Sequence, residues 1–201
     1  MIDTITNKPV TLHQGEKNHI EKFIMSPKFP WFWQDSQTFD KPEYFNKHLP
    51  GWLQPMLSHY NGPFLSHTLL RRSEDANESH MSRTASDFSI YYEFFIEIFH
   101  RFMIENNLKY SKIFRANLNL NWYNGIEHTE PHLDHPWPHC NFIMYLNTCK
   151  DGQTIIWPND FSTSYVIPCE QYTAVAFHQQ WHAHRYPSIG TRRVVFVVTY
   201  I

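Results

Sequence analysis

The stretch that decides the fold is Ile113–Trp122, which reads IFRANLNLNW. Its apolar residues alternate with a polar series made of Arg115, Asn117, Asn119 and Asn121. This period-two alternation predicts a strand with one buried face. Similar strand patterns follow at residues 141–146, 154–157, 165–167, 172–177 and 194–201, with turn residues between them. Short strands at this regular spacing indicate a sandwich or barrel.

The first 110 residues have a different composition, with many proline and aromatic residues near the N-terminus. Their pattern predicts a short helix over 16–25 and an exposed polar loop over 72–86. A second helix is predicted to begin at a capping residue, Ser86 or Asp87, and to end near Asn106. Aromatic side chains recur along it at intervals of three and four residues. We therefore expect residues 1–110 to form a helical and loop region that braces a β core at residues 111–201, within one integrated domain.

The composition excludes several classes of protein. With 201 residues and a net charge of -2, the chain has no basic footprint for nucleic acid. Its cysteines, Cys140, Cys149 and Cys169, are odd in number and lack C-x-x-C spacing, which favours free thiols in a reducing compartment. The N-terminus has no apolar signal core, and no apolar run is long enough to span a membrane. We expect a cytoplasmic protein that does not enter the membrane.

The chemistry is concentrated in two motifs of the β half. The first is Pro131-His132-Leu133-Asp134, which lies between two predicted strands. The second is Trp181-His182-Ala183-His184, followed by Gly190-Thr191-Arg192-Arg193. Two imidazoles and one carboxylate can hold one face of Fe(II) and leave the other positions open. An arginine after the last histidine adds a planar, permanently charged fork suited to a carboxylate.

Residues from about Leu118 to Ile201 resemble the Fe(II)- and 2-oxoglutarate-dependent oxygenases, particularly the prolyl-hydroxylase-like branch. The matching segments, in order, are PHLD, a strand ending in Tyr145-Leu146-Asn147, DGQT and HRYPSIGTRR. The N-terminal segments FPWFW and PFLSH are similar, more weakly, to phage and marine-bacterial members. The resemblance implies a double-stranded β-helix, the cupin-like jelly roll, with bracing helices and a catalytic core at residues 111–201.

The same resemblance implies a dioxygenase that binds Fe(II), uses 2-oxoglutarate as cosubstrate and O2 as oxidant, and releases succinate and CO2 as it hydroxylates a substrate. His132 and Asp134 correspond to the first two iron ligands. Tyr145 corresponds to a tyrosine that bonds the distal carboxylate of 2-oxoglutarate; its alternative role is an ordinary barrel-lining aromatic. Asn121 and Tyr123 are further candidates for the pocket wall, although a buried strand position is the alternative for Tyr123.

The third ligand has two candidates. His182 and His184 are two residues apart, so both face the same side of a strand, roughly 6–7 Å apart. In the family the arginine follows the distal histidine by nine to eleven residues. His184 with Arg193 gives nine, whereas His182 with Arg192 gives ten and matches a G-x-R motif. We expect His184 to bind iron and Arg193 to bind 2-oxoglutarate, with the other pairing left open.

Two other classes of protein fit the same histidines. One is a non-catalytic metal-binding β-barrel of cupin type, and the other is a cupin metalloenzyme without a cosubstrate. Binding of 2-oxoglutarate separates both from the oxygenase. The sequence leaves the substrate open among small molecules, peptides and nucleotides.

Overall fold

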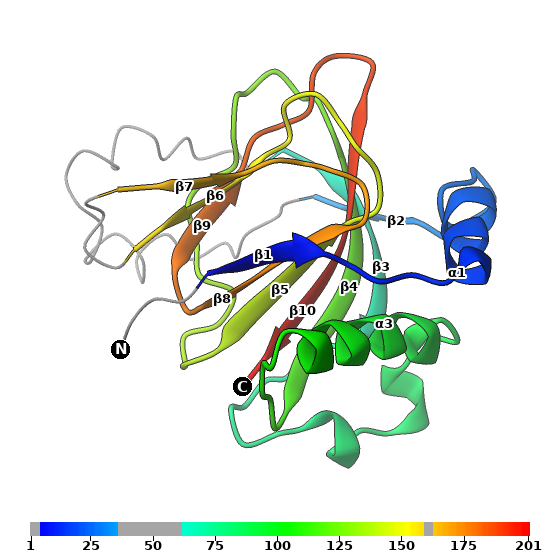
Figure 1. Cartoon of the computed structure of the whole chain (residues 1–201), viewed down its shortest axis with the longest axis vertical. Coiled ribbons are helices and arrows are strands. Elements are labelled where there is room, and N and C mark those ends of the chain that lie inside the picture. Colours follow the sequence, from blue (N-terminus) through cyan, green and yellow to red (C-terminus); the bar gives the residue numbers. More distant parts are fainter. Residues whose placement is uncertain (1–4, 36–61, 159–162) are drawn as a thin grey trace.

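The computed structural model describes residues 5–35, 62–158 and 163–201. Two antiparallel sheets face each other (Figure 1). The large sheet has the strand order β1-β8-β5-β10-β4-β3-β2, and the small sheet has the order β7-β6-β9. The strands are β1 Thr6–Pro9, β2 Phe32–Gln34, β3 Phe64–Leu70, β4 Ile113–Trp122, β5 Cys140–Tyr145, β6 Thr154–Trp157, β7 Tyr165–Ile167, β8 Thr173–His178, β9 Trp181–His184 and β10 Arg192–Tyr200.

This architecture confirms the predicted β-rich jelly roll with bracing helices. Strands β4, β6 and β7 have the predicted bounds, and β5, β8 and β10 differ by one or two residues at their ends. The first 110 residues contain more strand than we expected, since β1, β2 and β3 all join the large sheet. β1 and β2 have four and three residues, and all but one of these are exposed. Such short edge strands carry no period-two pattern, which explains why the sequence did not predict them.

The helices cover one face of the large sheet (Figure 1). Helix α1, Gln14–His19, continues as a π-helical turn over Ile20–Ile24, and helix α3 spans Tyr92–Glu105. The expected cap at Ser86 or Asp87 belongs instead to a separate 3-10 turn, Ala85–Asp87, so α3 begins later. The aromatic stripe of α3 packs on the sheet, with the rings of Phe95 and Phe196 5.0 Å apart. This contact places the main hydrophobic core between α3 and the sheet.

The opposite face of the large sheet looks toward the small sheet and carries the polar side chains of β4. Successive side chains of a strand point to opposite faces, so Leu118 and Leu120 join the α3 core while Asn117 and Asn119 line a cavity between the sheets. The cavity has a volume of about 90 Å³. Within the described ranges, no helix is long and apolar enough to cross a membrane.

Candidate metal centre and cosubstrate pocket

Three metal-binding side chains meet at one end of the cavity. His132, Asp134 and His182 each offer a ligand atom, and these atoms all lie within 4.8 Å of one another. The Nε2 atom of His182 is 3.4 Å from Oδ2 of Asp134. The backbone makes this meeting possible, because the N–H groups of His132 and His182 each donate to the other residue's carbonyl, at 2.9 and 3.1 Å. The PHLD segment is thereby attached to the edge of β9.

The two imidazoles are oriented by the backbone. Nδ1 of His132 lies 3.0 Å from the carbonyl oxygen of Glu130, and Nδ1 of His182 lies 3.2 Å from that of Gln180. A carbonyl can only accept a hydrogen bond, so we assign the ring proton to Nδ1 in both residues. Burial, followed by the neighbouring His182, lowers the pKa of His132 to about 4. Neutral rings that expose Nε2 are the form in which histidine binds a metal.

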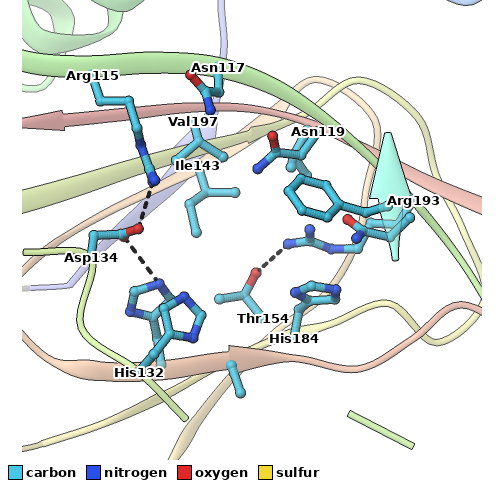
Figure 2. Close-up of a pocket in the computed structure, with 15 residues that line it drawn as sticks. Arg115, Asn117, Asn119, His132, Asp134, Ile143, Thr154, His184, Arg193 and Val197 are labelled. Atoms are coloured by element: carbon cyan, nitrogen blue, oxygen red, sulfur yellow. Dashed lines mark hydrogen bonds and ion pairs between the residues drawn. The ribbon is translucent and has the colours of Figure 1, made fainter. Parts of the chain in front are cut away.

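Asp134 completes this group as an anion. Burial would raise its pKa, but the neighbouring Arg115 guanidinium outweighs burial and holds the pKa well below its usual range. Nη2 of Arg115 is 2.6 Å from Oδ1 of Asp134, which leaves Oδ2 directed toward the histidines (Figure 2). Two imidazoles and one carboxylate are a ligand set that fits Fe(II).

Arg193 lies at the other end of the cavity (Figure 2). It is 3% exposed, and its guanidinium donates to the carbonyl of Gly152 and to Oγ1 of Thr154, both at 2.9 Å. Three of the five N–H donors of the Arg193 guanidinium are then not used by these two hydrogen bonds. No carboxylate of the described residues forms an ion pair with Arg193. A buried guanidinium with only neutral partners is costly, so this end of the cavity favours an anion.

Thr154 and Tyr145 extend the anion site. The hydroxyl of Tyr145 donates to Oγ1 of Thr154 at 2.7 Å, and burial raises the pKa of Tyr145 to about 12, which keeps it protonated. Oγ1 of Thr154 already accepts from Tyr145 and Arg193, so its own proton is available to a third group. Tyr145 thus contacts both Thr154 and Arg193, whose Cζ atom lies 5.5 Å from the centre of the Tyr145 ring.

The structure distinguishes the two arginines. Arg192 is exposed at the start of β10 and donates to the backbone carbonyl of Met25 at 3.0 Å. Arg193 pairs with Asn121 across β10 and β4 and enters the cavity. The alternation of β10 therefore directs Arg193, the preferred candidate, into the cavity and leaves Arg192 at the surface.

The two histidines are arranged differently from the expected order. The structure groups His182, and not His184, with His132 and Asp134. His184 lies two residues further along β9, paired in register with Thr154. Its Nε2 atom is buried and has no hydrogen-bond partner among the described residues. Burial, followed by Arg193, holds the pKa of His184 well below its usual value. The observed combination is therefore His182 with Arg193, a spacing of eleven residues.

Several cavity residues were not recognised in the sequence as site residues. Arg115, Asn117 and Asn119 line the cavity beside Asn121, which was a candidate. Their signal was present in the period-two alternation of β4, which placed all four on one face. Tyr123, the other candidate, is 43% exposed and lines a separate groove with Arg185.

The fold is also found in known structures. No protein-family model matches the chain, and no curated protein is similar to it in sequence. An oxidoreductase of the 2OG-Fe(II) oxygenase family from Burkholderia pseudomallei superposes with a TM-score of 0.65 and 12% identity, covering 98% of this chain and 84% of the other. A prolyl-4-hydroxylase from Pseudomonas putida superposes with a TM-score of 0.54 and 12% identity, covering 99% of this chain and 93% of the other.

A third similar structure is a prolyl hydroxylase from Trichoplax adhaerens in complex with a hypoxia inducible factor peptide fragment. It has a TM-score of 0.55 and 12% identity, over 100% of this chain and 84% of the other. At such low identity the likeness concerns the fold. The chain has the jelly-roll fold of the 2-oxoglutarate- and Fe(II)-dependent oxygenases, in its prolyl-hydroxylase-like form.

Proposed function

We propose that the protein is an Fe(II)- and 2-oxoglutarate-dependent dioxygenase that hydroxylates its substrate. One observation carries this proposal: a single buried cavity has a His-Asp-His group at one end and the buried, cationic Arg193 at the other. A dicarboxylate can join these ends, with one carboxylate at the metal and the other at the arginine. In this proposal the described part of residues 111–201 forms the catalytic core, and the described part of residues 1–110 braces it.

We assign the iron ligands to His132, Asp134 and His182. The reason is the shared geometry of the two histidines, since each turns Nδ1 toward a backbone carbonyl and has a ligand atom within 4.8 Å of one from Asp134. His184 is not part of this group, and its Nε2 is buried without a hydrogen-bond partner among the described residues. When bound, iron and 2-oxoglutarate supply the oxidation, in which O2 is consumed, succinate and CO2 are released and the substrate gains a hydroxyl group.

The chain's own contribution is to bind, orient and exclude water. Arg193 and the Thr154 hydroxyl offer charge-assisted and neutral hydrogen bonds to the distal carboxylate of 2-oxoglutarate. Tyr145 holds the Thr154 hydroxyl oxygen in place by donating a hydrogen bond to it. The valine side chains of β10 that line the cavity, Val195 and Val197, keep its middle apolar and nearly free of solvent.

The substrate is expected to be polar where it meets β4. Arg115, Asn117 and Asn119 form a row of donors and acceptors on the cavity wall, and Oδ1 of Asn117 is buried without a partner among the described residues. An unpaired buried amide oxygen is unfavourable, so a bound molecule that donates a hydrogen bond there would be stabilised. This chemistry suits a small polar molecule, a peptide or a nucleotide.

The decisive experiment is an anaerobic titration of purified protein with Fe(II), with and without 2-oxoglutarate. A weak visible charge-transfer band should appear only when both are present, and calorimetry should give one 2-oxoglutarate site per iron. Uncoupled formation of succinate in air is the second measurement. Iron binding without 2-oxoglutarate binding or succinate would replace the oxygenase with a metal-binding barrel.

A further inference from the structure

Two cysteines lie together behind the proposed cosubstrate site. Sγ of Cys149 is 2.9 Å from Sγ of Cys169, and the backbone N–H of Cys149 donates to the carbonyl of Cys169 at 3.2 Å. Both residues are buried, at 8% and 3% exposure. Cys140 is elsewhere, on β5, with its sulfur 3.4 Å from Nδ1 of His178. Neither the metal group nor the cavity wall includes the pair.

We propose that Cys149 and Cys169 form a reversible dithiol–disulfide site that controls the affinity of the pocket for 2-oxoglutarate. The oxidant is a hydroperoxide such as hydrogen peroxide. The Cys169 thiolate attacks a peroxide oxygen, the O–O bond breaks, and a sulfenic acid and water form once the leaving oxygen is protonated. The Cys149 thiol then displaces a second water and forms the S–S bond. The sulfurs lose two electrons, and the peroxide gains them.

The acid–base state of the pair supports this direction of attack. The hydrogen bond from the Cys149 thiol is the main cause that lowers the pKa of Cys169, and it acts against burial. The same hydrogen bond raises the pKa of Cys149, and burial adds to this effect. The thiolate is the nucleophilic form of cysteine. Cys169 is thus the attacking residue and Cys149 the resolving one.

Cys149 is coupled to Arg193 through Gly152. A Cβ atom placed on Gly152 would lie 2.5 Å from Sγ of Cys149, so the sulfur packs directly against this glycine. The carbonyl of Gly152 accepts the hydrogen bond from Nε of Arg193. Gly152 also has a φ angle of +70°, in the region that favours glycine. A larger side chain there would clash with Cys149 and strain the backbone that holds Arg193.

Cys169 is coupled to the same arginine through Asn147. Sγ of Cys169 donates to the Asn147 carbonyl at 3.4 Å. The Asn147 side chain bonds the Arg192 carbonyl and the Val194 N–H, each at 2.8 Å, and so holds the backbone on both sides of Arg193. The two thiols therefore contact Gly152 and Asn147, the two residues that position the Arg193 guanidinium.

Oxidation would disturb both the contact of Cys149 with Gly152 and the contact of Cys169 with Asn147. The S–S bond is about 2.05 Å long, so the sulfurs must approach each other, and both S–H donors are lost. The Asn147 carbonyl then loses its donor, and Cys149 moves relative to Gly152. Because this consequence rests on the proposed function, we expect oxidation to weaken 2-oxoglutarate binding roughly tenfold, the effect of one lost hydrogen bond, while metal affinity stays unchanged.

The test begins with chemistry that does not depend on the proposed function. Protein is treated with hydrogen peroxide, unreacted thiols are alkylated, and the peptides are analysed by mass spectrometry. The expected product is a Cys149–Cys169 cross-link that dithiothreitol reverses. Cys140→Ser should still form it, whereas Cys169→Ser should not. Absence of the cross-link in protein that remains folded would overturn the proposal.

The second arm measures 2-oxoglutarate binding by anaerobic calorimetry on Mn(II)-loaded protein, reduced and oxidised. Weaker binding of the oxidised form, restored by dithiothreitol and absent in Cys169→Ser, supports the control role. Equal affinity in both forms contradicts that role. A cross-link in protein that binds 2-oxoglutarate in neither form contradicts the proposed function but leaves the oxidation site intact.

Discussion

The two faces of the large sheet use the same strands for opposite purposes. On the α3 side, Phe142, Leu118 and Phe196 are fully buried among other apolar groups. On the cavity side, Arg193 and Asn121 are almost as deeply buried, although both are polar. The first arrangement stabilises the fold, whereas the second leaves buried donors and acceptors without partners among the described residues. The cavity face is therefore suited to a ligand, since buried polar groups stabilise a fold poorly unless something pairs with them.

The largest effect should come from the metal end of the cavity face. Asp134→Ala and His182→Ala should abolish stoichiometric Fe(II) binding, because each removes one of three ligands. The fold should persist, since the α3 core is untouched. Metal analysis and circular dichroism measure the two properties. Retention of one iron per protein with full turnover in Asp134→Ala would refute the ligand assignment, and the His128-x-Glu130 pair would become the next candidate.

The matched change on the opposite face is Phe196→Ala. Phe196 is fully buried against Phe95 and Phe142, so its truncation should lower the free energy of unfolding by about 3–5 kcal/mol. Iron and 2-oxoglutarate affinity of the folded fraction should change little. Urea denaturation and calorimetry measure these separately. A large loss of ligand affinity with unchanged stability would show that the two faces are not independent.

The arginine pair tests the comparison at neighbouring positions of β10. Arg193→Ala should weaken 2-oxoglutarate binding by about 100-fold, since a buried charge-assisted contact is lost, and iron affinity should hardly change. Arg193→Lys should retain only part of the 2-oxoglutarate affinity, because an ammonium lacks the planar fork of a guanidinium. Arg192→Ala is the control and should have little effect, since Arg192 is exposed. Equal losses in both alanine variants would argue against the assignment of Arg193.

The smallest expected effect separates the two histidines of β9. His184→Ala should keep iron and weaken 2-oxoglutarate binding by no more than about tenfold, the loss of one neutral hydrogen bond. His182→Ala should lose iron, as above. Metal analysis together with calorimetry decides between them. Loss of iron in His184→Ala, with iron retained in His182→Ala, would restore the order expected from the sequence.

Much of the fold was accessible from the sequence because it depends on local patterns. The alternation of β4 requires only that alternate side chains face the core. β6 and β7 were predicted as short runs of strand-forming residues bounded by turn residues. β1, β2, β3 and the delayed start of α3 were not predicted. β1 and β2 form because β8 and β3 offer them hydrogen-bonding edges. A segment of three or four residues contains no sequence pattern that reveals such a distant partner strand.

The site divides in the same way. The residue types of the proposed metal group, the His-x-Asp pair and the polar face of β4 could be predicted from the sequence, because they depend on residue identity and on a period of two. The sequence could not show which of His182 and His184 lies beside His132 and Asp134, since both face the same side of β9. The backbone bridge between residues 132 and 182 made that choice, and the register of β10 against β4 directed Arg193 inward. Pairings between distant strands set distances that spacing along the chain does not contain.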